Sequence, residues 1–191
     1  MSVKAQATEQ EKTLSNGVYG AAVIKPTFIN GEFSILSGAK IVWVYQGSFS
    51  IGASMYNILT RNQYALYVDS VTGKNPSLKF DYFGLDWEYF LLKTEHFKYS
   101  FCILFGSGRA EYYVQAKKNG DYFYSNYGYD WFYILEPGAN LTLKITEWME
   151  SCFGISYRYL VDSDYNVFGK HFANADFGGI TLSLMLKLGS F

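Results

Sequence analysis

The segment that most constrains this chain is residues 129–146, YDWFYILEPGANLTLKIT. Its odd-numbered residues are apolar throughout, whereas its even-numbered residues become polar and charged from Glu136 onward. Side chains of a β-strand alternate between two faces, so this pattern predicts one very long strand with an apolar and a polar side. Strands of globular proteins usually have about five or six residues, whereas a tilted membrane-crossing strand needs about 9–11. The segment therefore favours a strand that crosses a bilayer.

The composition agrees with a membrane protein built of strands. The chain has 191 residues, which is enough for one domain with a sizeable core. Only 17% of the residues are charged, against about 25% in ordinary soluble domains, and 20% are aromatic. The net charge of −1 gives nucleic-acid binding no electrostatic support. No apolar run approaches the roughly 18 residues of a transmembrane helix, so the membrane interpretation depends on strands.

Eight segments alternate in this way, at about residues 17–29, 33–45, 48–58, 78–91, 99–108, 129–146, 152–159 and 177–191. Asn30-Gly31 and Gln46-Gly47 predict tight hairpin turns. The connections after the second, fourth and sixth segments are short, whereas residues 59–77, 109–127 and 162–176 are long loops. Short turns at one end and long loops at the other are typical of bacterial outer-membrane barrels.

The sizes of the two faces decide which one points inward. The interior of an eight-stranded barrel is only just filled by side chains, so the bulky Phe, Tyr, Trp and Leu set would overpack it. The set rich in Gly, Ser and Thr fits, which leaves the bulky set facing lipid. We therefore predict an all-β, eight-stranded, antiparallel up-and-down transmembrane β-barrel over residues 17–191. The alternative in which the faces are inverted is a soluble, lipocalin-like ligand-binding barrel.

Charged residues on the inward face predict a paired network that closes the lumen, because unpaired charges are costly in a narrow interior of low dielectric constant. The predicted network comprises Lys25, Lys40, Asp86, Glu88, Glu136, Lys144, Arg158 and Lys187.

Aromatic residues on the outward face predict two girdles at the lipid headgroup levels, since amphipathic rings favour that position. The predicted girdle residues are Trp43, Tyr45, Trp87, Tyr89, Trp131 and Trp148.

The first 16 residues are interpreted as a signal-peptide remnant or a flexible leader. Residues 3–7 end in an Ala-x-Ala pattern, as at a signal-peptidase site, which would start the mature chain near Thr8. The apolar segment that should precede this pattern is absent, so a polar leader is the equal alternative.

Several stretches of the chain resemble small outer-membrane β-barrel proteins of Gram-negative bacteria, particularly the porin-like barrels of the Bacteroidetes type. The matching stretches are residues 30–38, 48–52, 135–141, 154–159 and 186–191. The resemblance implies residence in the bacterial outer membrane, contact with its lipid, and insertion by the barrel-assembly machinery. It also implies that Phe191 is the C-terminal aromatic assembly signal. Phe191 has the inward parity of Lys187, and a bulge at Gly189 would turn it outward.

The residues offer little support for catalysis. Some barrels of this size are lipid-modifying enzymes that use His with Ser or an acid, but His96 is placed in a short turn and His171 in a long loop. Asp86 and Glu88 share one face, and salt bridges to inward cations explain them better than a catalytic pair. Asp162, Asp164 and Asp176 lack the spacing of a calcium loop. No phosphate loop, zinc spacing or nucleophile elbow is found, so no cofactor or metal is predicted.

The predicted function is therefore non-enzymatic. The segment 122–129, YFYSNYGY, suits adhesive contact, because Tyr supplies a large contact area at a small entropic cost. It equally suits packing of the extracellular rim. We predict a structural or surface-interaction protein whose long loops face an extracellular or outer-membrane protein partner. The alternatives are a barrel that binds a small solute or lipid, and a lipid-modifying outer-membrane enzyme.

Overall fold

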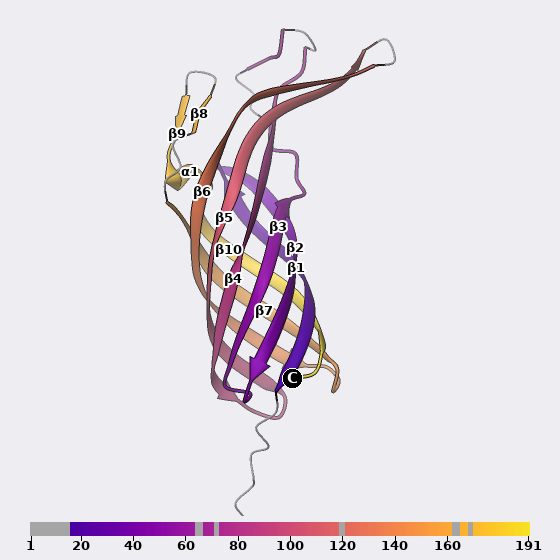
Figure 1. The fold of residues 1–191 in the computed structure, drawn as a ribbon, viewed down its shortest axis with the longest axis vertical. Coiled ribbons are helices and arrows are strands. Elements are labelled where there is room, and N and C mark those ends of the chain that lie inside the picture. Colours follow the sequence, from indigo (N-terminus) through magenta and orange to yellow (C-terminus); the bar gives the residue numbers. More distant parts are fainter. Residues whose placement is uncertain (1–15, 64–66, 71–72, 119–120, 162–164, 168–169) are drawn as a thin grey trace, which may run out of the picture.

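The protein forms one closed antiparallel β-barrel (Figure 1). The computed structural model describes residues 16–63, 67–70, 73–118, 121–161, 165–167 and 170–191. Nearly all of the predicted leader therefore lies outside the described residues. Neighbouring strands pair in the up-and-down order, and β10 closes the barrel against β1, which confirms the predicted fold class. The barrel strands are β1 (Gly17–Ile29), β2 (Glu32–Tyr45), β3 (Phe49–Ile58), β4 (Ser77–Lys93), β5 (Phe97–Lys118), β6 (Asp121–Lys144), β7 (Met149–Val161) and β10 (Gly179–Gly189).

Two tight turns form where the sequence predicts them. Asn30 and Gly31 have φ of 52° and 74°, and Gln46 and Gly47 have φ of 48° and 57°. Two successive positive φ angles define the type I′ turn, whose twist matches that of the flanking strands. The Gln46-Gly47 turn lies at the same end of the barrel as the start of β1, where Gly17 pairs with Val44, and the C-terminus lies there too (Figure 1).

The prediction that residues 109–127 form a long loop is wrong. β5 and β6 stay paired as far as Lys118 and Asp121, with one register irregularity between Glu111 and Tyr113. The two strands project well beyond the other barrel strands as a two-stranded ribbon (Figure 1). The segment has five Tyr among its 19 residues, and Tyr favours strands. Antiparallel pairing also satisfies the backbone hydrogen-bonding groups of the segment outside the barrel.

The third predicted loop contains regular structure of its own. β8 (Tyr165–Val167) and β9 (Lys170–Phe172) form a small two-stranded sheet, followed by the single-turn helix α1 (Asn174–Phe177). Phe177, predicted to begin the last strand, belongs to α1 and is fully buried. The strand begins only at Gly179, whose φ of 141° suits glycine.

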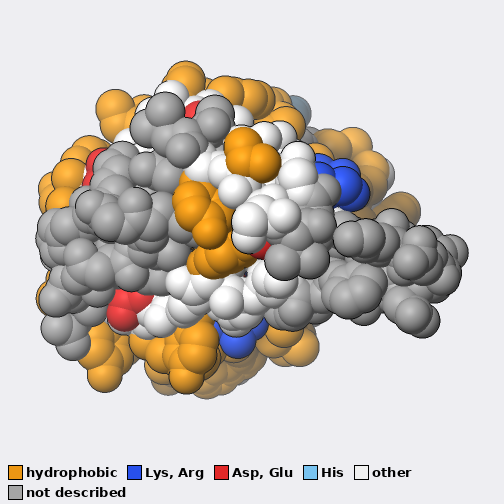
Figure 2. Space-filling view, turned by 90° about the horizontal axis from the view of Figure 1, so that it is seen from above, with side chains coloured by type: hydrophobic (Ala, Val, Ile, Leu, Met, Phe, Trp, Pro, Cys, Tyr) orange, Lys and Arg blue, Asp and Glu red, His pale blue; other side chains and the backbone are white. Residues whose placement is uncertain are grey.

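The two faces of the barrel wall differ as the sequence predicts. β1 alternates between buried and exposed residues over almost its whole length. On β10 the inward side chains are buried and the outward ones are exposed. The inward set is Thr181, Ser183, Met185 and Lys187, and the outward set is Ile180, Leu182, Leu184, Leu186 and Leu188. Hydrophobic side chains line much of the periphery when the barrel is viewed from the long-loop end (Figure 2).

Candidate functional site

The centre of the barrel holds a salt bridge between Lys25 and Glu136. Lys25 Nζ lies 2.8 Å from Glu136 Oε1, and the side chains of both residues are buried. Tyr82 donates a hydrogen bond of 3.1 Å to the other carboxylate oxygen, and Ser156 donates one of 2.6 Å to Oε1. The Lys25 ammonium also lies 3.9 Å from the centroid of the Tyr56 ring. Both carboxylate oxygens of Glu136 therefore accept hydrogen bonds, and the three partners come from β1, β4 and β7.

A second cluster surrounds Glu88 on β4. Asn140 donates a hydrogen bond of 2.9 Å to Glu88, and Ser100 donates another. Lys187 Nζ lies 3.6 Å from Glu88 Oε2, and Tyr19 donates to the same oxygen at 3.4 Å. Glu88 therefore joins β1, β5, β6 and β10 through the lumen.

Two more ion pairs lie inside the barrel. Lys40 Nζ is 2.5 Å from Asp86 Oδ1, and Lys98 Nζ is 2.5 Å from Glu150 Oε1. The second pair is not predicted, because Lys98 and Glu150 both lie just outside the predicted segments 99–108 and 152–159. The signal was present, since Lys98 has the same parity as inward Ser100.

Arg158 uses its hydrogen bonds differently from the other interior cations. It is fully buried, its Nε donates to the carbonyl oxygen of Phe177 at 2.9 Å, and its Nη2 donates to Thr27 Oγ1 at 3.3 Å. The guanidinium carbon lies 5.2 Å from the centroid of the Phe80 ring. Arg158 thus holds α1 in the mouth of the barrel, and it interacts with Glu136 only at longer range.

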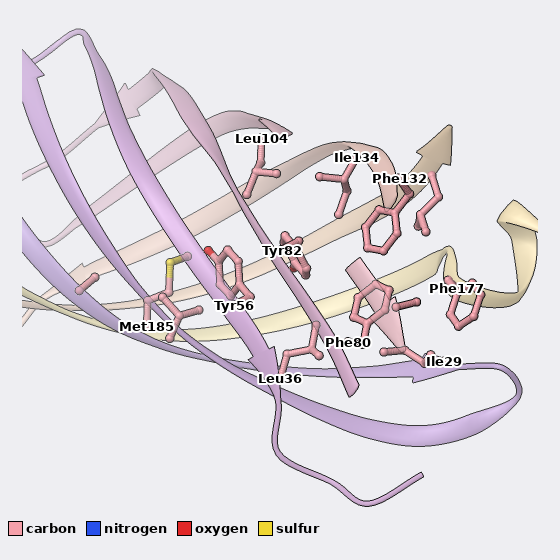
Figure 3. Close-up of a cluster of buried hydrophobic side chains, with 14 of the residues drawn as sticks. Ile29, Leu36, Tyr56, Phe80, Tyr82, Leu104, Phe132, Ile134, Phe177 and Met185 are labelled. Atoms are coloured by element: carbon pink, nitrogen blue, oxygen red, sulfur yellow. The ribbon is translucent and has the colours of Figure 1, made fainter. Parts of the chain in front are cut away.

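An apolar layer lies above the charged centre, toward the long-loop end. Phe80 stacks on Phe132 with 5.1 Å between ring centroids, and on Phe177 with 5.9 Å. Ile29 and Leu36 are buried in the same cluster (Figure 3). Charged and apolar side chains together occupy the lumen, and one cavity among them has a volume of about 20 Å³, enough for about one water molecule.

The prediction that Lys144 belongs to the interior network is wrong. Lys144 has the inward parity, but it is the last residue of β6 and its side chain is exposed. The alternation of side chains along a strand shows which face a residue is on, but it does not show where the strand leaves the barrel. Lys144 was therefore predicted to lie in the interior, although it lies at the end of the strand.

The residues predicted to form the girdles lie on the outer face of the barrel wall, and the girdles themselves stay a prediction. Trp43, Trp87, Tyr89, Trp131 and Trp148 are exposed, and Trp43 contacts the partly buried Tyr45 with 5.5 Å between ring centroids.

Phe191 does not turn outward. Its ring lies 5.4 Å from that of the buried Tyr19, and Lys98 Nζ lies 5.0 Å from its centroid. The strand pairing runs in register to Gly189 without the bulge that would restore the outward phase. The geometry that favoured an assembly signal at Phe191 is therefore absent, and the signal itself stays a prediction.

Comparisons with solved structures show which known folds this barrel resembles. The chain is similar to Neisserial surface protein A, with 13% identity, a TM-score of 0.58, and coverage of 91% of this chain and 96% of that one. The fold is that of an eight-stranded outer-membrane barrel. The N-terminal barrel domain of Pseudomonas aeruginosa OprF (14% identity, TM-score 0.49) and the Yersinia pestis attachment invasion locus protein Ail (12%, 0.46) are also similar, each over 91% of this chain and 96% and 95% of theirs. No family model and no curated protein matches the chain.

The projecting hairpin of this barrel packs against the first long loop. Tyr127 on β6 donates a hydrogen bond to Asp69, and its ring lies 5.4 Å from that of Tyr67. Burial and the hydrogen bond to Asp69 raise the pKa of Tyr127 above its ordinary value. Asn126 donates a hydrogen bond of 2.8 Å to Glu111, which joins the two strands of the ribbon at its base. These contacts connect the base of the ribbon to the first long loop.

The His and Asp residues that were considered for catalysis or calcium binding do not form a site in the described part of the chain. His96 is exposed between β4 and β5, and His171 lies in β9 at the other end of the barrel. Asp162 and Asp164 lie outside the described residues, and Asp176 caps α1 through the backbone of Ala173. In the described part of the chain, no three His, Cys, Asp or Glu residues are arranged to hold a metal ion.

None of the described helices is long and apolar enough to cross a membrane.

Proposed function

We propose that this chain is an integral protein of a bacterial outer membrane that keeps its lumen closed and presents the β5–β6 ribbon for contact at the cell surface. The observation that carries the proposal is the distribution of polarity across the barrel wall. Buried ion pairs fill the inside, and large apolar side chains such as Ile41, Met55 and Phe105 are exposed outside. A soluble barrel has the opposite arrangement, so lipid is the solvent that suits this surface.

The proposed role is non-enzymatic and extracellular. The ribbon and the long loops lie at one end of the barrel, and the Gln46-Gly47 turn and the C-terminus lie at the other (Figure 1). Insertion by the barrel-assembly machinery, a cleaved leader and kinship with the Bacteroidetes-type barrels belong to the same proposal. The small interior cavity speaks against a barrel that carries a solute, because sites for drug-sized ligands have about 300–1,000 Å³.

Reconstitution into phospholipid vesicles tests the membrane location and the closed lumen together. We expect the refolded protein to require detergent or lipid, to migrate differently on gels with and without boiling, and to show no steady conductance in planar bilayers. A monodisperse chain in plain buffer would refute the membrane location. A large, steady conductance in a correctly folded sample would refute only the closed lumen.

Protease digestion of intact cells tests the presentation of the ribbon. Lys117 and Lys118 lie at its far end, beyond the barrel wall. Trypsin added outside the cells should therefore cut there and leave two fragments, while the paired barrel strands resist. The variant Lys117→Gln/Lys118→Gln should lose this cleavage and keep any cleavage at Arg61 or Lys74 in the first loop. Uncut protein in intact cells, together with cleavage in lysed cells, would place the ribbon on the inner side of the membrane.

A further inference from the structure

A polar hollow of about 450 Å³ lies at the long-loop end of the barrel, between the first long loop and the base of the β5–β6 ribbon. It is lined by residues from two arms of the loop, at 61–63 and 73–77, and by residues 113–115 of β5. The loop and the ribbon stand at the end opposite the Gln46-Gly47 turn (Figure 1). The volume of the hollow is within the range of ligand sites, about 300–1,000 Å³.

Backbone contacts between the two arms of the loop hold the walls of the hollow in place. Gln63 forms a β-bridge with Ser77, and the N–H of Leu78 donates a hydrogen bond of 2.7 Å to the carbonyl oxygen of Asn62. Ser77 also pairs with Tyr113, which joins the second arm to β5. The walls are therefore organised before a ligand binds, and this lowers the entropic cost of binding.

The charged side chains that line the hollow are all positive. Arg61 and Lys74 are exposed cations, and none of the described residues that line the hollow is an acid. The acidic residue of the same loop, Asp69, is buried and accepts a hydrogen bond from Tyr127. The hollow therefore suits an anion, because a guanidinium group forms strong charge-assisted hydrogen bonds with carboxylates and phosphates.

The rest of the lining offers hydrogen bonds more than apolar contact. Val114 is buried, Tyr113 is partly buried, and the other described residues of the lining include no large apolar side chain. Protein partners usually need an apolar patch at the centre of an interface. Gln63 and Gln115 are exposed and carry carboxamides, which both donate and accept hydrogen bonds. The lining therefore suits a ligand rich in hydroxyl groups.

We propose that this hollow binds an acidic sugar, a saccharide unit that carries a carboxylate or a phosphate. The proposal rests on the cell-surface position of the long-loop end proposed above, and it names the chemistry of the contact made there. The acidic group binds the Arg61 guanidinium, whose planar fork of donors fits either anion, and Lys74 adds a second positive charge. The sugar hydroxyls bind the carboxamides of Gln63 and Gln115. Such a sugar can belong to a glycolipid of the same membrane or to a glycan of another cell.

Isothermal titration calorimetry of the refolded barrel in detergent micelles tests the proposal with soluble sugars. Sialyllactose carries a carboxylate and glucose monophosphate a phosphate, and lactose and glucose are their neutral counterparts. We expect at least one acidic sugar to bind about tenfold or more tightly than its neutral counterpart, since hydrogen bonds to charged groups are the stronger ones. A preference for the phosphate would favour a glycolipid of the same membrane, and a preference for the carboxylate a glycan of another cell.

The outcomes separate this inference from the proposed function. Equal binding of acidic and neutral sugars, or no binding, by a barrel that shifts on gels would overturn the inference and leave the membrane location standing. Inorganic phosphate that binds as tightly as the acidic sugars would show that the carboxamides contribute nothing, and it would overturn the sugar assignment. A chain that binds an acidic sugar but needs no detergent or lipid would refute the membrane location alone.

Matched variants locate the site. Arg61→Gln should weaken binding of the acidic sugar about tenfold or more, because it removes the charged donors of the hollow. Arg109→Gln makes the same exchange at the same end of the barrel, on β5 outside the hollow, and should leave binding unchanged. Lys74→Gln should weaken binding of the acidic sugar and leave that of its neutral counterpart unchanged. Equal effects of the two Arg variants would show that the sugar does not bind in the hollow.

Discussion

Replacing Glu136 by Gln is expected to lower the free energy of unfolding by about 3–5 kcal/mol, the usual cost of removing one partner of a buried ion pair. The carboxylate binds Lys25 at 2.8 Å and accepts hydrogen bonds from Tyr82 and Ser156. A neutral amide leaves the buried Lys25 ammonium without its counter-charge. It also removes the long-range partner of Arg158. Both cations would then have to remain charged in an interior that water scarcely enters.

The measurement is urea titration of the protein in vesicles, with the folded fraction read from the gel shift. Asp81→Asn is the matched control, because it also neutralises one carboxylate next to cations, but on the outer wall at partial exposure. Exposed ion pairs contribute about 0–1 kcal/mol, so this variant should change the stability little. Similar losses in the two variants would show that the interior is hydrated and that its ion pairs are weak.

A double-mutant cycle isolates the salt bridge itself. Lys25→Met with Glu136→Leu removes both charges, and the double variant should lose less stability than the two single variants added together. Residues in direct contact show coupling energies of about 0.5–3 kcal/mol. Strict additivity would mean that Glu136 acts through Tyr82 and Ser156 instead of Lys25.

The barrel could be predicted from the sequence because the alternation of its strands and two of its turns are specified by residues close together in the chain. The period-two alternation fixes which side of the wall each side chain faces, so inward Lys25, Lys40 and Glu136 were found from parity alone. Asn30-Gly31 and Gln46-Gly47 formed the expected turns, because their positive φ angles need few neighbours to specify them. These features depend on residues adjacent in sequence.

The features that could not be predicted depend on contacts distant in sequence. Nothing near Phe177 shows that its carbonyl oxygen binds Arg158, 19 residues away, and that its ring stacks on Phe80. The pairing of Lys98 with Glu150 likewise needs the register of β5, β6 and β7. The paired ribbon beyond residue 109 is missed because its apolar residues Ala110, Tyr112 and Val114 are buried on the inward face, whereas the apolar face that marks the barrel strands points outward.

Placing Arg at Leu184 is expected to cost about 2–4 kcal/mol, because a cation on the lipid face near the bilayer midplane is strongly destabilising. Leu184 lies in the middle of β10, is 47% exposed, and pairs with outward residues Ile24 and Phe153, which are also exposed. The same substitution in a soluble barrel would place the cation in water and would change stability by about 0.5 kcal/mol or less. The variant therefore tests which solvent surrounds the wall.

The control for this experiment is the same type of substitution at an outward position close to the membrane interface. Phe28 is 61% exposed next to the Asn30-Gly31 turn, at the long-loop end of the barrel. Phe28→Arg should cost only about 0–1 kcal/mol from the charge, since the cost falls to that level near the membrane interface. Urea titration in vesicles would measure both variants against Leu184→Ala and Phe28→Ala, so that lost packing cancels. A charge cost that is large at Leu184 and small at Phe28 requires a bilayer with its midplane near Leu184, whereas equal small costs would require water around the whole wall.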